Sequence, residues 1–221
     1  IYTSIDRRTT ITTQALEVHS AGGFIETSGH ILNLLASINA GRGGIWLLDP
    51  GDLTVAATSG SYYSSSGPGI PTSFYTNNYS TVQISASQIT SVLNAGTDVV
   101  VYTTGGTGSG NGDININSSI ITGAMSGNAT LTFKALRNIT IANDVVIDAT
   151  QNSNTKKLNV VLWADADNSG GGYVTVGTYN GTTNLSGIKS NGGDIYLSGG
   201  TDYTTGYAKG ISGFQMGVSL Y

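Results

Sequence analysis

Hydrophobic residues recur at alternate positions in short segments over most of this chain. In each of seven segments two apolar residues are separated by one residue, which is the period of a β-strand with one buried face. Runs rich in Gly, Asn, Asp and Ser separate the segments and are too short for crossover helices. The pattern predicts an all-β fold in which strand–turn–strand units stack directly. The seven pairs are Val99/Val101, Ile114/Ile116, Leu131/Phe133, Ile139/Ile141, Val160/Leu162, Val174/Val176 and Ile195/Leu197.

A longer repeat is also visible. Segments that begin at Asp113, Asn138 and Tyr173 each open a unit, and a second strand follows 16 to 21 residues later. Units of about 20–25 residues would give about nine or ten stacked coils, as in repeat architectures of this size. The period is irregular, which favours a β-helix with variable loops over a strict short repeat.

Residues 57–81 interrupt the alternation. This stretch is rich in Ser, Tyr and Gly, contains two of the three prolines and has no periodicity. We therefore expect it to form an excursion that leaves the stacked units.

Residues 85–96 carry the only helical signal in the sequence. Ser85 and Gln88 have the spacing of a capping box, and Gly96 fits the residue that follows a helix. We expect one short helix here. Its apolar face consists of Ile89, Val92 and Leu93.

Composition narrows the class of protein. With 32 glycines, 10% charged residues and a net charge of −4, the chain lacks the high charge of a disordered protein. The pI near 4.8 argues against a nucleic-acid partner, which would require Lys and Arg. The absence of Cys excludes disulfides and thiol chemistry. No run reaches the ~18 apolar residues of a membrane span, so no membrane insertion is predicted.

Two dense motifs carry a family resemblance. GGFIETSG occupies residues 22–29, and IWLLDPGDLTV occupies residues 45–55, about one repeat later. Together they resemble the exoproteins of bacterial two-partner secretion, which include filamentous-haemagglutinin-like adhesins and haem/haemopexin-binding exoproteins. The segments LTFKALRNITI at 131–141 and LNVVLWAD at 158–165 are similar to repeats of that family. The resemblance covers about residues 10–200.

This resemblance implies a right-handed parallel β-helix, or β-solenoid, that is secreted to the exterior or cell surface of a Gram-negative bacterium. It implies that residues 1–221 are a single β-helix segment of a longer exoprotein, since the signal peptide and the Asn-Pro-Asn secretion domain of the family are not in the sequence. It further implies an outer-membrane transporter as partner during secretion. A host-cell or matrix surface protein, or a glycan, is the expected binding partner, and no cofactor is expected.

The carboxylates are candidates for catalysis because polysaccharide-active enzymes also use this fold. Glycoside hydrolysis requires two acids ~5–10 Å apart. Asp49 and Asp52 belong to an Asp-Pro-Gly-Asp turn sequence, and Asp113 and Asp194 resemble repeated turn residues. No catalytic residue is therefore predicted. The enzyme alternative requires convergence of Asp144, Asp148, Asp165 and Asp167.

The sequence DADNSG at 165–170 matches the first six positions of a calcium-binding loop. Asp165, Asp167 and Ser169 are the candidate ligands, although Val176 stands where the loop expects a bidentate Glu. A plain turn is the alternative. The two histidines, His19 and His30, lack a second ligand at suitable spacing and are interpreted as surface or turn residues.

Aromatic residues give the candidate binding site. Trp46 and Trp163 lie in apolar strands and are expected to pack in the core or at corners. Four tyrosines of the excursion, together with its Ser and Gly residues, suit an adaptable recognition surface. A loop that only covers one flank is the alternative. The four candidates are Tyr62, Tyr63, Tyr75 and Tyr79.

The sequence is compatible with three functions. The favoured hypothesis is a non-catalytic, cell-surface adhesin-like β-helix. The alternatives are a host carrier-protein or ligand receptor of the haemopexin-binding type, and a polysaccharide-active β-helix enzyme.

Overall fold

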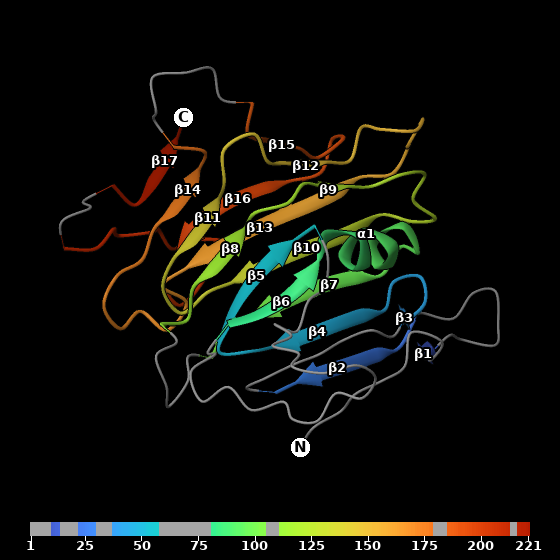
Figure 1. The fold of residues 1–221 in the computed structure, drawn as a ribbon, viewed down its shortest axis with the longest axis horizontal. Helices are drawn as coiled ribbons and strands as arrows, with labels where there is room; N and C mark the ends of the chain where they lie inside the picture. Colours follow the sequence, from blue (N-terminus) through green and yellow to red (C-terminus); the bar gives the residue numbers. More distant parts are fainter. Residues whose placement is uncertain are drawn as a thin grey trace, which may run out of the picture.

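Parallel strands make up most of the regular structure. The computed structural model describes residues 10–13, 22–29, 37–57, 81–104, 111–178, 185–212 and 216–221. Within these residues every strand pair is parallel. The predicted all-β class with one helix is confirmed at this level (Figure 1).

The largest sheet, which we call sheet I, has six strands whose spatial order follows their order in the sequence. Its colours therefore run from blue to orange-red across the sheet in Figure 1. Its strands are β2 (Phe24–Ser28), β4 (Ile45–Asp49), β7 (Asp98–Tyr102), β10 (Ala129–Lys134), β13 (Leu158–Ala164) and β16 (Ile195–Gly199).

Sheet II also has six strands, but its first two are exchanged relative to the sequence. The spatial order places β6 on the far side of β5 from β8. The chain leaves β5 at residue 57 and later forms β6, which pairs with the edge of β5 that faces away from β8. The strands of sheet II, in spatial order, are β6 (Thr81–Ser85), β5 (Asp52–Ala56), β8 (Ile114–Ile116), β11 (Ile139–Ile141), β14 (Val174–Val176) and β17 (Val218–Leu220).

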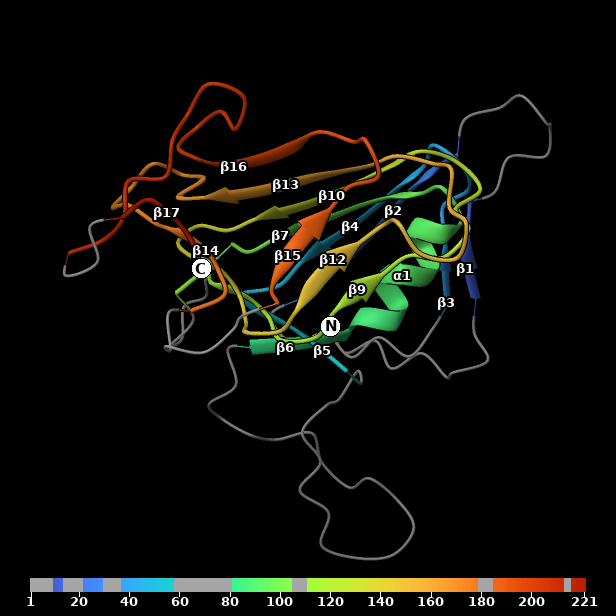
Figure 2. The same cartoon turned by 90° about the horizontal axis from the view of Figure 1, so that it is seen from above.

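A shorter sheet III contains β9 (Ile120–Ile121), β12 (Val146–Asp148) and β15 (Gly187–Lys189). Figure 2 shows these strands in a row beside sheet I. A separate two-stranded sheet pairs β1 (Thr10–Thr12) with β3 (Ser37–Asn39). After β7 the chain visits sheets II, III and I in the same order each time, so each passage adds one strand to each sheet.

The helix α1 (Ala86–Asn94) lies next to β9, at the end of sheet III. The predicted capping box is confirmed, since the Ser85 side chain accepts the Gln88 N–H at 3.1 Å and the Gln88 side chain accepts the Ser85 N–H. Gly96 has the positive φ of 73° expected after the helix. The predicted apolar face is buried. Thus α1 fills the position that a further strand of sheet III would take.

The three sheets enclose one apolar core. Register pairs apolar residues in columns, as in Val99, Leu131 and Val160 of sheet I. Six of the seven predicted pairs are buried. In the seventh, Ile195 lies in a strand but is 44% exposed, because β16 is the edge strand of sheet I. Trp46 is fully buried, as expected.

The expected repeat length holds for one pair of neighbouring strands in sheet I and fails for the others. Register partners are 21 residues apart between β2 and β4, 53 between β4 and β7, 32 between β7 and β10, 29 between β10 and β13, and 35 between β13 and β16. The spacing varies because the segments that connect strands of different sheets differ in length. Sheets I and II contain six strands each in the described chain, not about nine or ten.

Candidate binding surface

The outer face of sheet I carries a column of large side chains. Val101, Phe133 and Leu162 point into the core, so the residues that follow them, Tyr102, Lys134 and Trp163, point outward. These three residues are register partners on β7, β10 and β13. Parallel pairing therefore stacks their side chains along the sheet.

Lys134 lies between two aromatic rings. Its Nζ is 4.3 Å from the centroid of the Tyr102 ring and 4.4 Å from that of the Trp163 ring. Both distances lie within the range of a cation–π interaction. In the described chain the ion pairs involve other cations, namely Arg137, Lys189 and Lys209. The charge of Lys134 is thus held by rings and not by a carboxylate.

Two tyrosines extend this column. The ring centroids of Trp163 and Tyr203 are 5.5 Å apart, and those of Tyr196 and Tyr203 are 5.2 Å apart with an edge-on angle of 86°. The Trp163 indole N–H donates to the carbonyl of Gly200, which holds the segment with Tyr203 against the sheet. We call Tyr102, Lys134, Trp163, Tyr196 and Tyr203 the aromatic strip.

The strip is ordered but still reaches solvent. All five side chains are half-buried. Rings already fixed by neighbours lose little conformational entropy on binding, which suits an aromatic contact surface. Trp and Tyr are also enriched among the residues that dominate binding energy. The arrangement can therefore present aromatic edges, phenol hydroxyls and one cation to a partner.

The sequence prediction for Trp163 was wrong. Trp163 faces outward at the centre of the strip and does not pack in the core. The signal that could have placed it is the alternation itself, because Trp163 directly follows the inward-facing Leu162.

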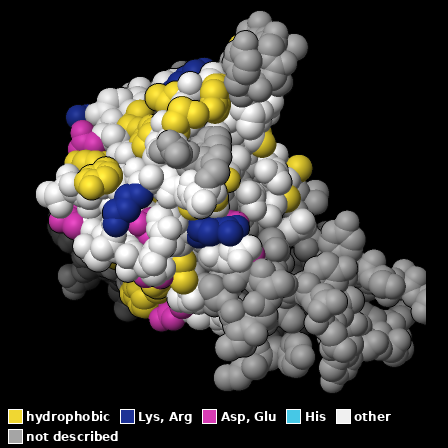
Figure 3. Space-filling model, turned by 90° about the vertical axis from the view of Figure 1, so that its left-hand side faces the viewer, with side chains coloured by type: hydrophobic (Ala, Val, Ile, Leu, Met, Phe, Trp, Pro, Cys, Tyr) yellow, Lys and Arg dark blue, Asp and Glu magenta, His cyan; other side chains and the backbone are white. Residues whose placement is uncertain are grey.

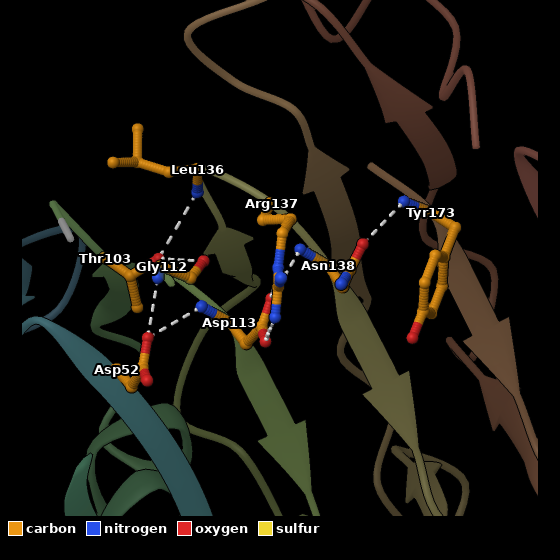
Figure 4. Close-up of polar contacts among 8 residues, drawn as sticks. All are labelled: Asp52, Thr103, Gly112, Asp113, Leu136, Arg137, Asn138 and Tyr173. Carbon is orange, nitrogen blue, oxygen red and sulfur yellow. Dashed lines mark hydrogen bonds and ion pairs between the residues drawn. The ribbon is translucent and has the colours of Figure 1, made fainter. Parts of the chain in front are cut away.

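A ladder of polar side chains occupies the N-terminal ends of the strands of sheet II (Figure 4). Asp52 Oδ1 accepts the N–H groups of Gly112 and Asp113 at 2.6 and 2.9 Å. Asp113 Oδ1 accepts the N–H of Asn138 at 3.1 Å, and Asn138 Oδ1 accepts that of Tyr173 at 3.2 Å. The turn positions predicted from the repeat thus act by linking one strand to the next.

The carboxylates of the enzyme alternative are engaged in separate turns. Asp144 Oδ1 accepts the N–H of Leu185 at 3.1 Å. Asp148 is buried and accepts hydrogen bonds from Thr150 and Gln151, with Lys189 Nζ at 3.2 Å. Neither turn brings these carboxylates into the loop at 165–170.

Asp49 lies half-buried at the end of β4. Burial raises the pKa of Asp49, and the charge of Glu26 adds to this effect, whereas a hydrogen bond from Thr104 opposes it. Asp52, the other acid of this turn, accepts the two backbone hydrogen bonds of the ladder.

The calcium candidates do not point to one centre. Asp165 is fully buried, its Oδ1 accepts the N–H of Gly171 at 3.2 Å, and its Oδ2 is 3.9 Å from Lys209 Nζ. Asp167 instead accepts the N–H of Ser169 at 3.2 Å on the exposed side of the turn. Asp165 already has a cationic partner in Lys209. Among the described residues no group of three or more His, Asp or Glu side chains could hold a metal ion.

The remaining site candidates lie outside the described residues. These are Tyr62, Tyr63, Tyr75 and Tyr79 of the expected excursion, and His19 and His30.

No family model matches this chain, and no curated protein matches it in sequence. No helix in the described segments is long and apolar enough to cross a membrane. On the face shown in Figure 3, charged side chains are few and lie among uncharged surface and separate apolar patches.

Proposed function

We propose that this chain is a non-catalytic β-helix segment of a secreted, adhesin-like exoprotein on the surface of a Gram-negative bacterium. The stacked strands of sheets I, II and III are taken as the sides of a right-handed parallel β-helix. Support comes from the repeated passage of the chain through the three sheets and from the motifs at residues 22–29 and 45–55.

The absence of a catalytic role is supported by how the carboxylates are used. Asp52, Asp113, Asp144 and Asp148 accept backbone or side-chain hydrogen bonds that join strands or order turns. These hydrogen bonds give each carboxylate a role in folding, which favours a structural use over an acid–base use.

The aromatic strip is the observation that supports a binding role. It places Lys134 between the rings of Tyr102 and Trp163, with two further tyrosines packed in line beyond Trp163, on a regular parallel sheet. Such a surface fits a host-cell or matrix surface protein, or a glycan whose sugar rings stack on aromatic side chains. During secretion the partner would be an outer-membrane transporter.

The test is adhesion of the purified chain to cultured epithelial cells and to immobilised matrix proteins. Trp163→Ala combined with Tyr203→Ala should reduce retention by about tenfold or more, since anchor residues at interfaces contribute ~2 kcal/mol or more. Ile121→Ala is the matched control, because Ile121 is 44% exposed and lies on sheet III. If the double variant is retained as well as the Ile121→Ala control, the aromatic strip does not mediate adhesion.

The strip also serves the receptor alternative, in which the partner is a soluble host carrier protein. Retention of a serum protein on the immobilised chain, lost in the same double variant, would favour that alternative over cell adhesion. Circular dichroism with a strand spectrum and an elongated shape in small-angle scattering are expected for the β-helix. A compact shape would contradict it.

A further inference from the structure

The buried carboxylate of Asp165 lies beside an amine and an amide that the adhesin proposal does not use. Lys209 Nζ contacts Asn168 Oδ1 and is 3.9 Å from Asp165 Oδ2. The Asp165 side chain is fully buried, and its Oδ2 has no hydrogen-bond partner. The Lys209 amine therefore lies next to both a carboxamide and a shielded carboxyl group, and the Lys209 side chain is 43% exposed.

The backbone holds these groups together. Asp165 and Asn168 both adopt positive φ angles, 49° and 56°, and the Asn168 N–H donates to the Asp165 carbonyl at 2.8 Å. The segment with Lys209 is attached to the same loop, because the Gly210 N–H donates to the Gly172 carbonyl at 3.0 Å. The side chains therefore meet on two segments already fixed to one another, which removes most of the entropic cost of a reaction between them.

We infer that Lys209 and Asn168 form an intramolecular isopeptide bond with Asp165 as general acid and base. The Asp165 carboxylate takes one proton from the Lys209 ammonium, and the neutral amine attacks Cγ of Asn168. Asp165, now protonated, donates a hydrogen bond to the amide oxygen and then gives its proton to the leaving nitrogen. The Asp165 carboxylate next accepts the second proton of the attacking nitrogen, and this proton leaves with the released ammonia as ammonium. A C–N bond forms, a C–N bond breaks, and one ammonia molecule leaves. No oxidant or cofactor is needed.

The cross-link would join positions 41 residues apart. It would tie the loop after β13 to the segment after β16, and so enclose β14, β15 and β16 in a covalent ring. A second Lys–carboxyl contact, Lys189 with Asp148, lacks the amide and serves as an internal comparison. Asp148 is fully hydrogen-bonded and stays an ion-pair partner.

The experiment measures the intact mass of the denatured full chain by mass spectrometry and then sequences its proteolytic fragments. The wild-type chain should be lighter than its calculated mass by one ammonia and should yield a branched peptide joining Asn168 to Lys209. K209R retains the positive charge and should have the full calculated mass. D165N should form the bond about 100-fold more slowly or not at all, as expected when an acid–base group is removed.

Succinimide formation at Asn168 also releases ammonia, and the same set of variants separates it from the cross-link. A mass loss that persists in K209R, or a wild-type chain at full mass after prolonged incubation, would overturn the inference. Cross-linking of D165N at the wild-type rate would overturn the role of Asp165. Circular dichroism checks that each variant is folded. If D165N does not fold, K209R and N168A still test the cross-link, because each lacks one partner of the bond and should have its full calculated mass. Thermal unfolding gives a further readout, because K209R should unfold at lower temperature than the cross-linked chain.

Discussion

Asp113 and Asn138 occupy equivalent positions immediately before β8 and β11, and Oδ1 of Asp113 accepts the backbone N–H of Asn138 at 3.1 Å. The same relation occurs in sheet I, where Asp98 accepts the N–H of Thr130 at 2.7 Å. A short polar side chain on one strand thus satisfies a backbone donor of the next, at the point where the ladder of strand hydrogen bonds begins. These contacts hold the register of successive strands.

Asp113→Ala should lower the free energy of unfolding by about 1–3 kcal/mol, because the N–H of Asn138 and the guanidinium of Arg137 both lose their acceptor. Asp113→Asn is the matched control. It keeps an acceptor for Asn138 and loses only a partly exposed ion pair, so about 1 kcal/mol or less is expected. Urea unfolding measures both. Equal losses would mean that the ion pair, and not the ladder, stabilises this turn.

Two glycines of one loop should differ strongly in how much the same substitution destabilises the fold. A Cβ at Gly172 would lie 2.0 Å from the carbonyl oxygen of Arg137, whereas a Cβ at Gly170 meets nothing within 4 Å. Gly172→Ala should therefore destabilise the fold by more than about 2 kcal/mol, since backbone must move. Gly170→Ala should change stability by about 0.5 kcal/mol or less. Thermal unfolding of the two variants, compared side by side, decides whether the loop packs as closely as described.

Protonation of Asp148 should lower the free energy of unfolding in acid. Burial acts to raise its pKa, but hydrogen bonds from Thr150 and Gln151 and the contact with Lys189 outweigh burial and lower the pKa from 3.8 to about 2. Because the folded-state pKa is the lower one, the contribution is complete above pH 4 and is lost as the pH falls through 2. The difference corresponds to about 2 kcal/mol.

Asp148→Asn should remove this part of the acid sensitivity. Unfolding free energies of wild type and variant, measured between pH 5 and about 2, should converge as the pH falls. Parallel curves over that range would show that Asp148 is not the group responsible.

The charge of Asp98, unlike that of Asp148, should lower the stability of the fold. Burial raises its pKa, and the hydrogen bond from the Thr130 N–H only partly opposes this. Asp98→Asn keeps an acceptor for that N–H and removes a charge that burial disfavours, so the variant should be more stable than wild type at neutral pH. The advantage should shrink as the pH drops and Asp98 becomes protonated. A variant that is less stable at neutral pH would contradict this assignment.

The two tryptophans should differ in access to a quencher. Trp46 is fully buried and donates its indole N–H to Thr27 Oγ1 at 3.0 Å, whereas Trp163 is half-buried on the outer face of sheet I. Acrylamide should therefore quench the fluorescence of Trp46→Phe, which reports Trp163, more strongly than that of Trp163→Phe. Equal quenching would mean that the strip is covered.

The sequence alone was sufficient for the local structure. Alternation at pairs such as Ile139/Ile141 predicted strands that are found and buried, because period-2 patterning reports one covered face. Ser85 and Gln88 predicted the helix start, since a capping box depends only on residues three apart. Asp113, interpreted as a repeated turn residue, lies directly before β8 and accepts a hydrogen bond from the residue directly before the next strand of sheet II.

Contacts between strands were decided only by the tertiary structure. The exchange of β5 and β6, the spacing of 21 to 53 residues between neighbouring strands of sheet I and the outward position of Trp163 depend on which strand pairs with which, and in which register. A shift of one residue would move every side chain to the other face, and no local pattern shows the partner strand. For the same reason the aromatic strip and the meeting of Asp165, Asn168 and Lys209 join residues far apart in the sequence. Local propensity acts over a few residues, whereas these sites exist only after parallel strands have stacked.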